Sequence, residues 1–207
     1  MRVLIGTTNP SKAEQFAGML SGFGLEFVTL DDLGVMDEPQ ETGKTPMENA
    51  MIKAAFYGQY ADSVICADSG LYFDCMALDD PRQPGLQIRT PQGGKRLGDE
   101  EMIAYYAGLV HSFGGKVMAY YLNGIAVKTG GVVHGFQWTR EEARIGAFYM
   151  LDTPCAARNP GWPLDSLSVD QRGISFCDPK WEEPEQLSWE RESRLRQFLI
   201  EKLSLTE

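Results

Sequence analysis

Hydrophobic and polar positions follow two different periods along this chain. Short apolar runs bounded by turn residues are typical of buried strands, whereas apolar residues three and four positions apart are typical of helices that bury one face. Helices are therefore expected at 10–21, from 46 onward, at 99–113 and at 188–203. Strands are expected at 3–5, 26–28, 64–67, 71–76, 116–128 and 131–150. Strands that alternate with helices and then form a long antiparallel pair predict an α/β fold with a mixed, elongated sheet flanked by helices.

Two of the predicted helices have clear start signals. Asn9 is a good N-cap, and Pro10 suits the first helical position, whose N–H would be unbonded in any case. Thr45 followed by Pro46 starts the second helix, with Glu48 at the capping-box position. Both helices are therefore expected to begin directly after these capping residues.

Length and composition bound the architecture and the location of the protein. The 207 residues are 43% hydrophobic, enough for a substantial core, and we expect one α/β domain over 1–207, with two lobes around a cleft as the alternative. The apolar run Val3–Ile5 is too short for a signal peptide or a membrane span, which predicts a cytoplasmic protein. The four cysteines lack CxxC spacing and are expected to be buried free thiols.

The formal net charge of −10 limits the partners of the chain. Phosphate backbones and anionic membranes are bound through basic patches, so neither a nucleic acid nor a membrane is expected as a partner. A small anionic substrate stays open, because carboxylates can hold a divalent metal that supplies positive charge locally.

Lys12 is the first residue in an unusual place. It lies in the first turn of the helix that Asn9 caps, where the macrodipole disfavours a cation by roughly 0.3–1 kcal/mol. One interpretation is a solvated lysine. The other is that Asn9, Lys12 and the N–H groups of the helix start together receive a phosphate.

Acidic and small residues follow a predicted strand. Asp68, Ser69 and Gly70 come directly after 64–67, where α/β sheets usually place ligands, although an ordinary Asp-Ser-Gly turn is an equally good interpretation. Gly70 would let the backbone approach a substrate closely. Glu41, in the polar segment before the second helix, is either a loop residue or a second metal-binding carboxylate.

These residues together have one economical explanation. The carboxylates of Glu41 and Asp68 with Mg²⁺, and the ammonium groups of Lys12 and Lys53, suit a triphosphate. Metal and lysines would offset the charge that shifts to the leaving oxygens. Asp68 could also orient or deprotonate the attacking water. On its own, Lys53 is more typical of an exposed surface position.

Three sequence blocks resemble the inosine-triphosphate pyrophosphatase family, whose members hydrolyse non-standard purine nucleoside triphosphates. Residues 7–12 resemble its opening T/S-x-N-x-x-K, and residues 41–54 resemble E-T-G-x-T-x-x-E-N-A-x-x-K-A nearly throughout. Residues 67–74 resemble D-D-S-G-L-x-V-D. The order and spacing of the blocks also match, so the resemblance is more specific than any one motif.

The resemblance implies a fold, a reaction and a set of site residues. The fold would be an elongated α/β structure with a central nucleotide cleft, commonly a homodimer. The reaction would be Mg²⁺-dependent hydrolysis of a nucleoside triphosphate to its monophosphate and pyrophosphate, with Mn²⁺ as the alternative metal. Asp68 and Lys12 would be catalytic. The residues for which phosphate or substrate binding is implied are Thr7, Asn9, Lys12, Lys53 and Ser69. Metal binding is implied for Glu41 and Asp68. A further substrate contact is implied for Arg89, because residues 84–89 match P-G-x-x-S-A-R.

The chain also departs from the family pattern. Ala67 replaces the first acidic residue of the D-D-S-G block. The family's G-F-G-Y-D-P-I-F segment and its C-terminal S-H-R motif have no clear counterpart. Residues 159–165 stand in the place of the first, with Trp162 available to stack on a base. We therefore expect the phosphate chemistry to be kept, while the preferred base stays open.

The sequence also bears on three other functional classes. A nucleotide-binding or regulatory protein that has lost turnover is the alternative, and Ala67 and the altered C-terminal half motivate it. A P-loop enzyme is excluded, because Gly93-Gly94-Lys95 and Gly114-Gly115-Lys116 lack the G-x-x-x-x-G-K-[ST] frame. A dinucleotide enzyme is excluded because no G-x-G-x-x-G follows the first strand.

Overall fold

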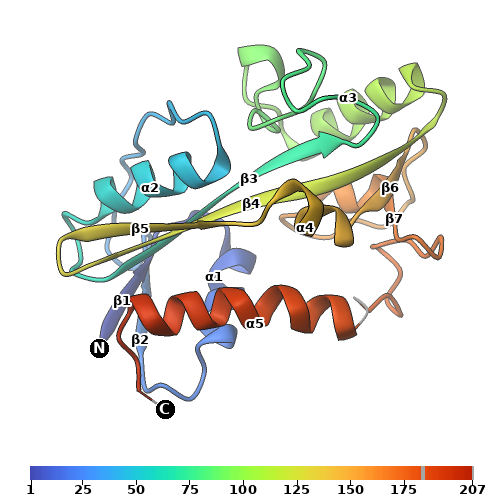
Figure 1. The fold of residues 1–207 in the computed structure, drawn as a ribbon. Helices are drawn as coiled ribbons and strands as arrows, with labels where there is room; N and C mark the ends of the chain where they lie inside the picture. The colour runs from blue at the N-terminus through green and yellow to red at the C-terminus, as the bar shows by residue number, and fades with distance from the viewer. Residues whose placement is uncertain (183–184, 207) are drawn as a thin grey trace. The chain divides into compact units, whose positions relative to one another are not determined.

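The computed structural model describes residues 1–182 and 185–206, the side chains of 185–191 excepted (Figure 1). The described chain forms two compact units. The first contains Met1–Ser69, Asn123–Trp138 and 185–206, and the second contains Gly70–Leu122 and 139–182. Two long strands, β3 and β4, contribute residues to both units.

The described strands form a seven-stranded mixed sheet in the order β2-β1-β3-β4-β6-β7, with β5 paired to β4. β1 is parallel to β2 and β3, whereas β4 is antiparallel to β5 and β6. The predicted α/β fold with a mixed sheet flanked by helices is therefore confirmed. The strand bounds are Arg2–Ile5 (β1), Glu26–Thr29 (β2), Val64–Phe73 (β3), Lys116–Thr129 (β4), Val132–Gln137 (β5), Phe148–Leu151 (β6) and Ser168–Val169 (β7).

The helices begin where their capping residues predict. Asn9 Oδ1 accepts a hydrogen bond from the Ser11 N–H at 3.0 Å, and Thr45 Oγ1 accepts one from the Glu48 N–H at 3.1 Å.

No helix of the described chain is long and apolar enough for a membrane crossing. The helices are α1 (Pro10–Met19), α2 (Pro46–Tyr57), α3 (Asp99–Ser112), α4 (Arg140–Ile145) and α5 (Glu185–Lys202), with 3₁₀ turns at Pro91–Gly93 and Pro163–Leu167.

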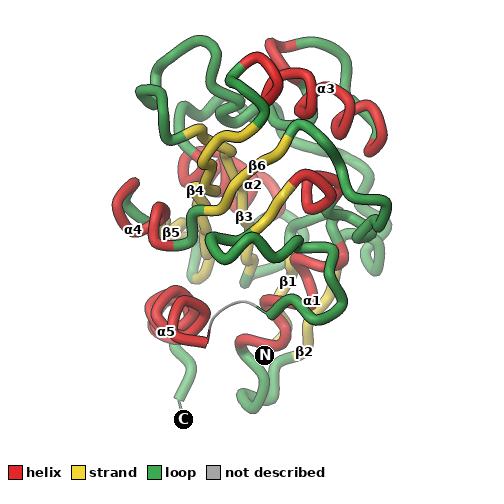
Figure 2. The backbone as a smooth tube through the Cα atoms, turned by 90° about the vertical axis from the view of Figure 1, so that its right-hand side faces the viewer, coloured by secondary structure: helices red, strands yellow, loops and turns green. Residues whose placement is uncertain are grey.

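The strands of the first unit bury both faces. Val3 and Ile5 of β1 pack with α1 and α5, while Leu4 between them packs with α2, because successive side chains on a strand point to opposite faces. Ile65 and Cys66 of β3 repeat this alternation. In Figure 1, α2 lies on one side of these strands and α1 and α5 on the other; Figure 2 shows α5 nearly end-on. As predicted, α5 packs through Leu195, Phe198, Leu199 and Leu203.

The core of the second unit is built on α3. One face of this helix is buried against β3, β4 and β6, which contribute Phe73, Val117 and Phe148 to the same cluster. The 3₁₀ turn at Pro163–Leu167 adds two further leucines. The buried residues of α3 are Met102, Ile103, Tyr106 and Val110.

A close backbone approach fixes the start of α2. The Met47 N–H donates to Gln137 Oε1 of β5 at 3.0 Å, which satisfies one of the helix's unpaired N–H groups. Gly124 of β4 lies directly beneath this turn, and a Cβ there would overlap the backbone atoms Met47 N and Pro46 C. Glycine at position 124 therefore lets α2 lie directly on the sheet.

The expectation of one long strand over 131–150 is wrong. The segment forms β5, then α4, then β6. Helix α4 begins in a reciprocal capping box, in which Thr139 Oγ1 accepts from the Glu142 N–H at 3.2 Å and Glu142 Oε2 accepts from the Thr139 N–H at 2.8 Å. The Thr-x-x-Glu signal stands in the sequence, and its local hydrogen bonds turn the chain out of the sheet.

The cysteines are free thiols, as predicted, but not all of them are buried. Cys66 and Cys177 are buried, whereas Cys155 is half-buried and Cys75 is exposed. Burial raises the pKa of the Cys66 thiol to about 12, so this thiol stays protonated and inert at neutral pH.

Candidate active site

The candidate site lies where β1 ends beside β3 in the first unit. Ile5, the last residue of β1, pairs with Ile65, and β3 continues for three residues to Asp68. Asp68 therefore lies inside β3 and not at a strand end, and the expected separation of 64–67 from 71–76 is wrong. β3 continues because β4 stays beside it in the sheet. Asp68 does lie beyond the end of β1, because Ile65, three residues before it, pairs with the last residue of β1.

Both oxygens of the Asp68 carboxylate are bonded by side chains of α2. Lys53 Nζ donates to Oδ1 at 3.1 Å, and Asn49 Nδ2 donates to Oδ2 at 3.0 Å. Residues four apart lie one above the other on a helix, so α2 presents these two groups together. The Asp68 side chain is 14% exposed, which leaves it open to solvent on one side.

Lys53 joins Asp68 to the polar loop before α2. Its Nζ contacts Glu41 Oε1 at 2.7 Å as well as Asp68 Oδ1 at 3.1 Å, and its side chain is 17% exposed. Burial by itself would lower the pKa of Lys53, but the attraction of Asp68 and the bond to Glu41 outweigh it and raise the pKa. The lysine is therefore charged at neutral pH and neutralises part of the two carboxylates.

Lys12 reaches the same strand from α1. Its Nζ donates to Ser69 Oγ at 3.2 Å. Burial and the charge of Lys53 lower its pKa, against the opposing attraction of Asp68 and Glu41. The fold thus brings residues that are distant in sequence into one cluster. Lys12 contacts Ser69 directly, and Glu41 is joined to Asp68 through Lys53.

Thr7 and Asn9 shape the turn between β1 and α1. The Asn9 N–H donates to Thr7 Oγ1 at 3.1 Å, while Asn9 Oδ1 caps the helix. The N-terminus of α1 carries no acidic residue in its first turn, so its positive end is not neutralised by its own sequence. Such a helix end suits an anion.

The acidic groups fit a divalent cation only in part. Glu41 and Asp68 direct two oxygens at one cation, the Lys53 ammonium. Among the described residues, no cluster of three or more His, Cys, Asp or Glu side chains could hold a metal. Two carboxylates suit Mg²⁺, which commonly takes one or two carboxylates and completes its shell with substrate phosphates and water.

Three predicted residues, Gly70, Arg89 and Trp162, belong to the second unit, where their contacts are structural. A Cβ on Gly70 would lie 2.6 Å from the ring of Tyr72, so packing also requires this glycine. Arg89 Nη1 pairs with Asp99 at 2.9 Å. The backbone N–H of Trp162 donates to the backbone carbonyl of Asn159 at 3.0 Å, which places Trp162 in a tight turn. Their roles toward a substrate stay predictions.

Asn49 is a residue that motif reasoning did not assign to the site. Its signal is an amide one helical turn before Lys53, on the face of α2 that carries the lysine. Asparagine is uncommon in a helix interior, and one that is buried there indicates a specific hydrogen-bonding partner.

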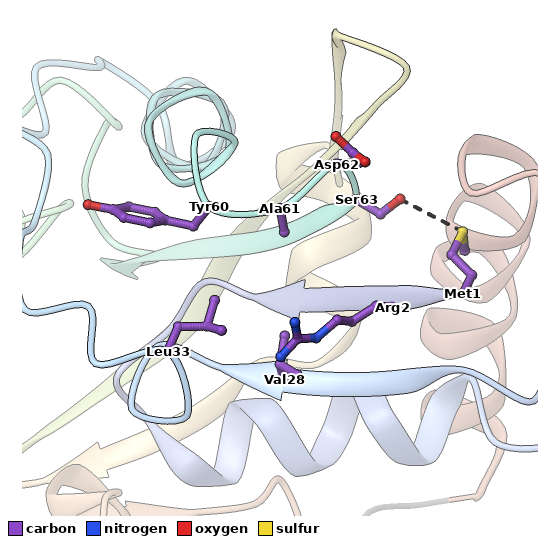
Figure 3. Close-up of a pocket in the computed structure, with 8 residues that line it drawn as sticks. All are labelled: Met1, Arg2, Val28, Leu33, Tyr60, Ala61, Asp62 and Ser63. Carbon is purple, nitrogen blue, oxygen red and sulfur yellow. Dashed lines mark hydrogen bonds between the residues drawn. The ribbon is translucent and has the colours of Figure 1, made fainter.

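A pocket of about 320 Å³ lies elsewhere in the first unit (Figure 3). Met1 and Arg2 at the start of β1, and Ser63 just before β3, line it together with Leu33 and Tyr60. It therefore lies where β1 and β3 begin, whereas Asp68 lies beyond the other end of β1. None of the predicted site residues lines this pocket.

The sequence is similar to known proteins over its whole length. A sequence model of the Ham1 family matches residues 3–130. A dITP/XTP pyrophosphatase from Thermoanaerobacter pseudethanolicus is 37% identical over 210 aligned positions, which cover 98% of each chain.

Solved structures extend the similarity to the fold. The Ham1 protein of Staphylococcus aureus aligns with a TM-score of 0.67 at 18% identity, over 98% of this chain and 100% of that one. A nucleoside-triphosphatase / dITP/XTP pyrophosphatase from Mycobacterium abscessus aligns with a TM-score of 0.63 at 22% identity, over 96% and 99%. At these identities the structures show a shared fold.

Proposed function

Because the chain belongs to the Ham1 family, we propose that it hydrolyses nucleoside triphosphates to the nucleoside monophosphate and pyrophosphate. The observation that best supports this is the contact of one ammonium group, that of Lys53, with the carboxylates of Glu41 and Asp68 at 2.7 and 3.1 Å. Hydrolysis of a phosphoanhydride needs a group that activates water and cations that take up phosphate charge. The cluster supplies groups of both kinds.

Glu41 and Asp68 are the residues that would hold Mg²⁺, with Mn²⁺ as the alternative. Their oxygens already share one cation, and carboxylates are ligands that both metals prefer. When bound, such a metal would offset phosphate charge and lower the pKa of a water molecule.

The chain's own residues would carry the other steps. The N-terminus of α1 and the Lys12 ammonium would bind phosphate oxygens, with Thr7 and Ser69 adding hydroxyl groups. Asp68 would orient a water molecule and accept its proton as the water oxygen bonds to the α-phosphorus. The bond between the α- and β-phosphates then breaks, and pyrophosphate leaves with the electron pair of that bond.

The substrate class follows from the relatives. The similar bacterial proteins are named dITP/XTP pyrophosphatases, and we extend these two substrates, dITP and XTP, to this chain. Trp162 would stack on the base and Arg89 would contact the nucleotide. Both assignments rest on the sequence resemblance.

A nucleotide-binding protein without turnover is the second candidate. Ala67 motivates it, because the family pattern has a carboxylate at this position. The remaining carboxylates and lysines favour hydrolysis, since Asp68 keeps partners on both of its oxygens.

A product assay separates the two candidates. The purified chain is incubated with ITP, XTP, dUTP and the four standard NTPs, with Mg²⁺ or with EDTA, and pyrophosphate and phosphate are measured separately. We expect metal-dependent release of pyrophosphate, fastest with ITP or XTP. Folded protein that binds these nucleotides but releases no pyrophosphate would establish the silent binder instead.

Lys12→Ala is expected to weaken triphosphate binding more than monophosphate binding. Loss of one charge-assisted bond to an outer phosphate corresponds to about 10- to 100-fold in Kd. Calorimetric titration with a non-hydrolysable triphosphate analogue and with the matching monophosphate measures both. Lys44→Ala, which removes an exposed lysine from the Glu41 loop, is the control and should change neither. Equal losses for the two ligands in Lys12→Ala would refute a role on the outer phosphates.

A further inference from the structure

Asn49 is a buried polar side chain in the second turn of α2. Only 2% of the residue is exposed. Asparagine is a weak helix former, and a buried amide is costly unless its donors and acceptor are bonded. Apolar packing therefore does not explain this residue, and its hydrogen bonds must.

The two ends of the amide bond to two different parts of the site. Nδ2 donates to Asp68 Oδ2 at 3.0 Å, and Oδ1 accepts from the Gly43 N–H at 2.8 Å. A backbone N–H only donates and a carboxylate only accepts, so these partners determine which end of the amide faces which. Aspartate at this position would lack the donor, and leucine would lack both functions.

The contact with Gly43 anchors the loop that carries Glu41. A Cβ on Gly43 would lie 2.6 Å from Asn49 Oδ1 and 2.8 Å from Asn49 N, so the loop backbone lies directly on α2. Glu41 stands two residues before this anchor, and its carboxylate contacts Lys53 at 2.7 Å. Asn49 therefore joins the Asp68 carboxylate to the Glu41 segment through one rigid amide.

We propose that Asn49 is a positioning residue, which holds the Asp68 carboxylate and the Glu41 segment in one mutual geometry without touching the substrate. With Oδ1 on Lys53 and Oδ2 on Asn49, the plane of the Asp68 carboxylate is fixed, and each oxygen keeps a lone pair for water or a metal. A misplacement of 1 Å at a reacting group can cost about 100-fold in rate. This inference rests on the proposed hydrolysis.

Two substitutions separate the two hydrogen bonds. Asn49→Asp keeps an acceptor for the Gly43 N–H but removes the donor to Asp68, whereas Asn49→Ala removes both. Glu48→Ala is the matched control: Glu48 is the exposed neighbour whose Oε2 holds the same loop by accepting from the Lys44 N–H at 2.6 Å, and no described bond joins it to Asp68.

Each variant is measured as the full chain in three ways. Steady-state kinetics with the best NTP give kcat and KM, hydrogen exchange of the Gly43 amide reports the loop anchor, and crystal structures report the Asp68 side chain. We expect kcat to fall about 100-fold in both Asn49 variants with KM within about threefold. The Gly43 amide should exchange faster in Asn49→Ala and stay protected in Asn49→Asp. Glu48→Ala should keep kcat within about twofold.

Several results would overturn the inference. Unchanged kcat in both Asn49 variants would show that Asp68 is held without the amide. An equal fall in Glu48→Ala would assign the effect to loop anchoring in general, and a rise in KM alone would make Asn49 a substrate contact. If the wild type hydrolyses no NTP, the proposed function fails. The crystal structures then decide the positioning role: an unmoved Asp68 side chain refutes it and a reoriented one supports it.

Discussion

Asp68→Asn is expected to lower turnover by on the order of 10²- to 10⁴-fold, the usual contribution of a positioned acid–base group. The substitution keeps the shape of the side chain but removes the charge that would accept a proton and help to hold a metal. Two donors, Lys53 Nζ and Asn49 Nδ2, face this carboxylate, and an asparagine offers only one acceptor oxygen. One of these two hydrogen bonds is therefore lost, which costs about 1–3 kcal/mol of stability.

Turnover of the best NTP and urea unfolding of the same preparations test this prediction. Asp32→Asn is the control, because Asp32 is exposed and bonds to Thr29 away from the site. It should keep turnover within about twofold. A folded Asp68→Asn protein with nearly wild-type turnover would remove Asp68 from the mechanism.

Gly124→Ala is expected to destabilise the first unit and to lower turnover as well. The added Cβ would overlap Met47 N and Pro46 C, which are backbone atoms and cannot rotate away. Overpacking of this kind costs about 1–3 kcal/mol or more. The start of α2 must shift to relieve it, and α2 carries both Asn49 and Lys53, so activity falls beyond what the lower stability explains.

The comparison glycine is Gly108, which lies on the exposed face of α3 with nothing within 4 Å of an added Cβ. Gly108→Ala should stabilise the protein by roughly 0.5–1 kcal/mol, because alanine loses less backbone entropy in a helix. Urea unfolding midpoints and kcat are measured for both variants. Equal, small effects of the two substitutions would show that α2 does not depend on the close approach.

Local signals in the sequence predicted the framework of the candidate site. The caps at Asn9 and Thr45 act through neighbouring backbone groups, so sequence alone places both helix starts. The spacing of Asn49 and Lys53 predicts that they share a face of α2. These features depend on residues within one or two helical turns of each other.

Features that depend on distant residues or on short elements could not be predicted in the same way. The bond between Lys12 and Ser69 joins residues 57 positions apart, and no local pattern encodes it. Helix α4 has six residues, too few for a helical period to stand out against the alternation of the strands beside it. The roles of Arg89 and Trp162 concern a ligand, so neither periodicity nor capping bears on them.

Helix α5 has a consequence for how the protein is made. On the ribosome, the blocks at 7–12, 41–54 and 67–74 are synthesised before α5, which follows them in the chain. Until then, the apolar face of β1 has α1 on it but lacks the cover of Leu195 and Leu199, and nascent chains with such partly uncovered strands are prone to aggregate. Protection of the nascent chain, by slow translation or by a chaperone, therefore matters most in the interval before α5 docks.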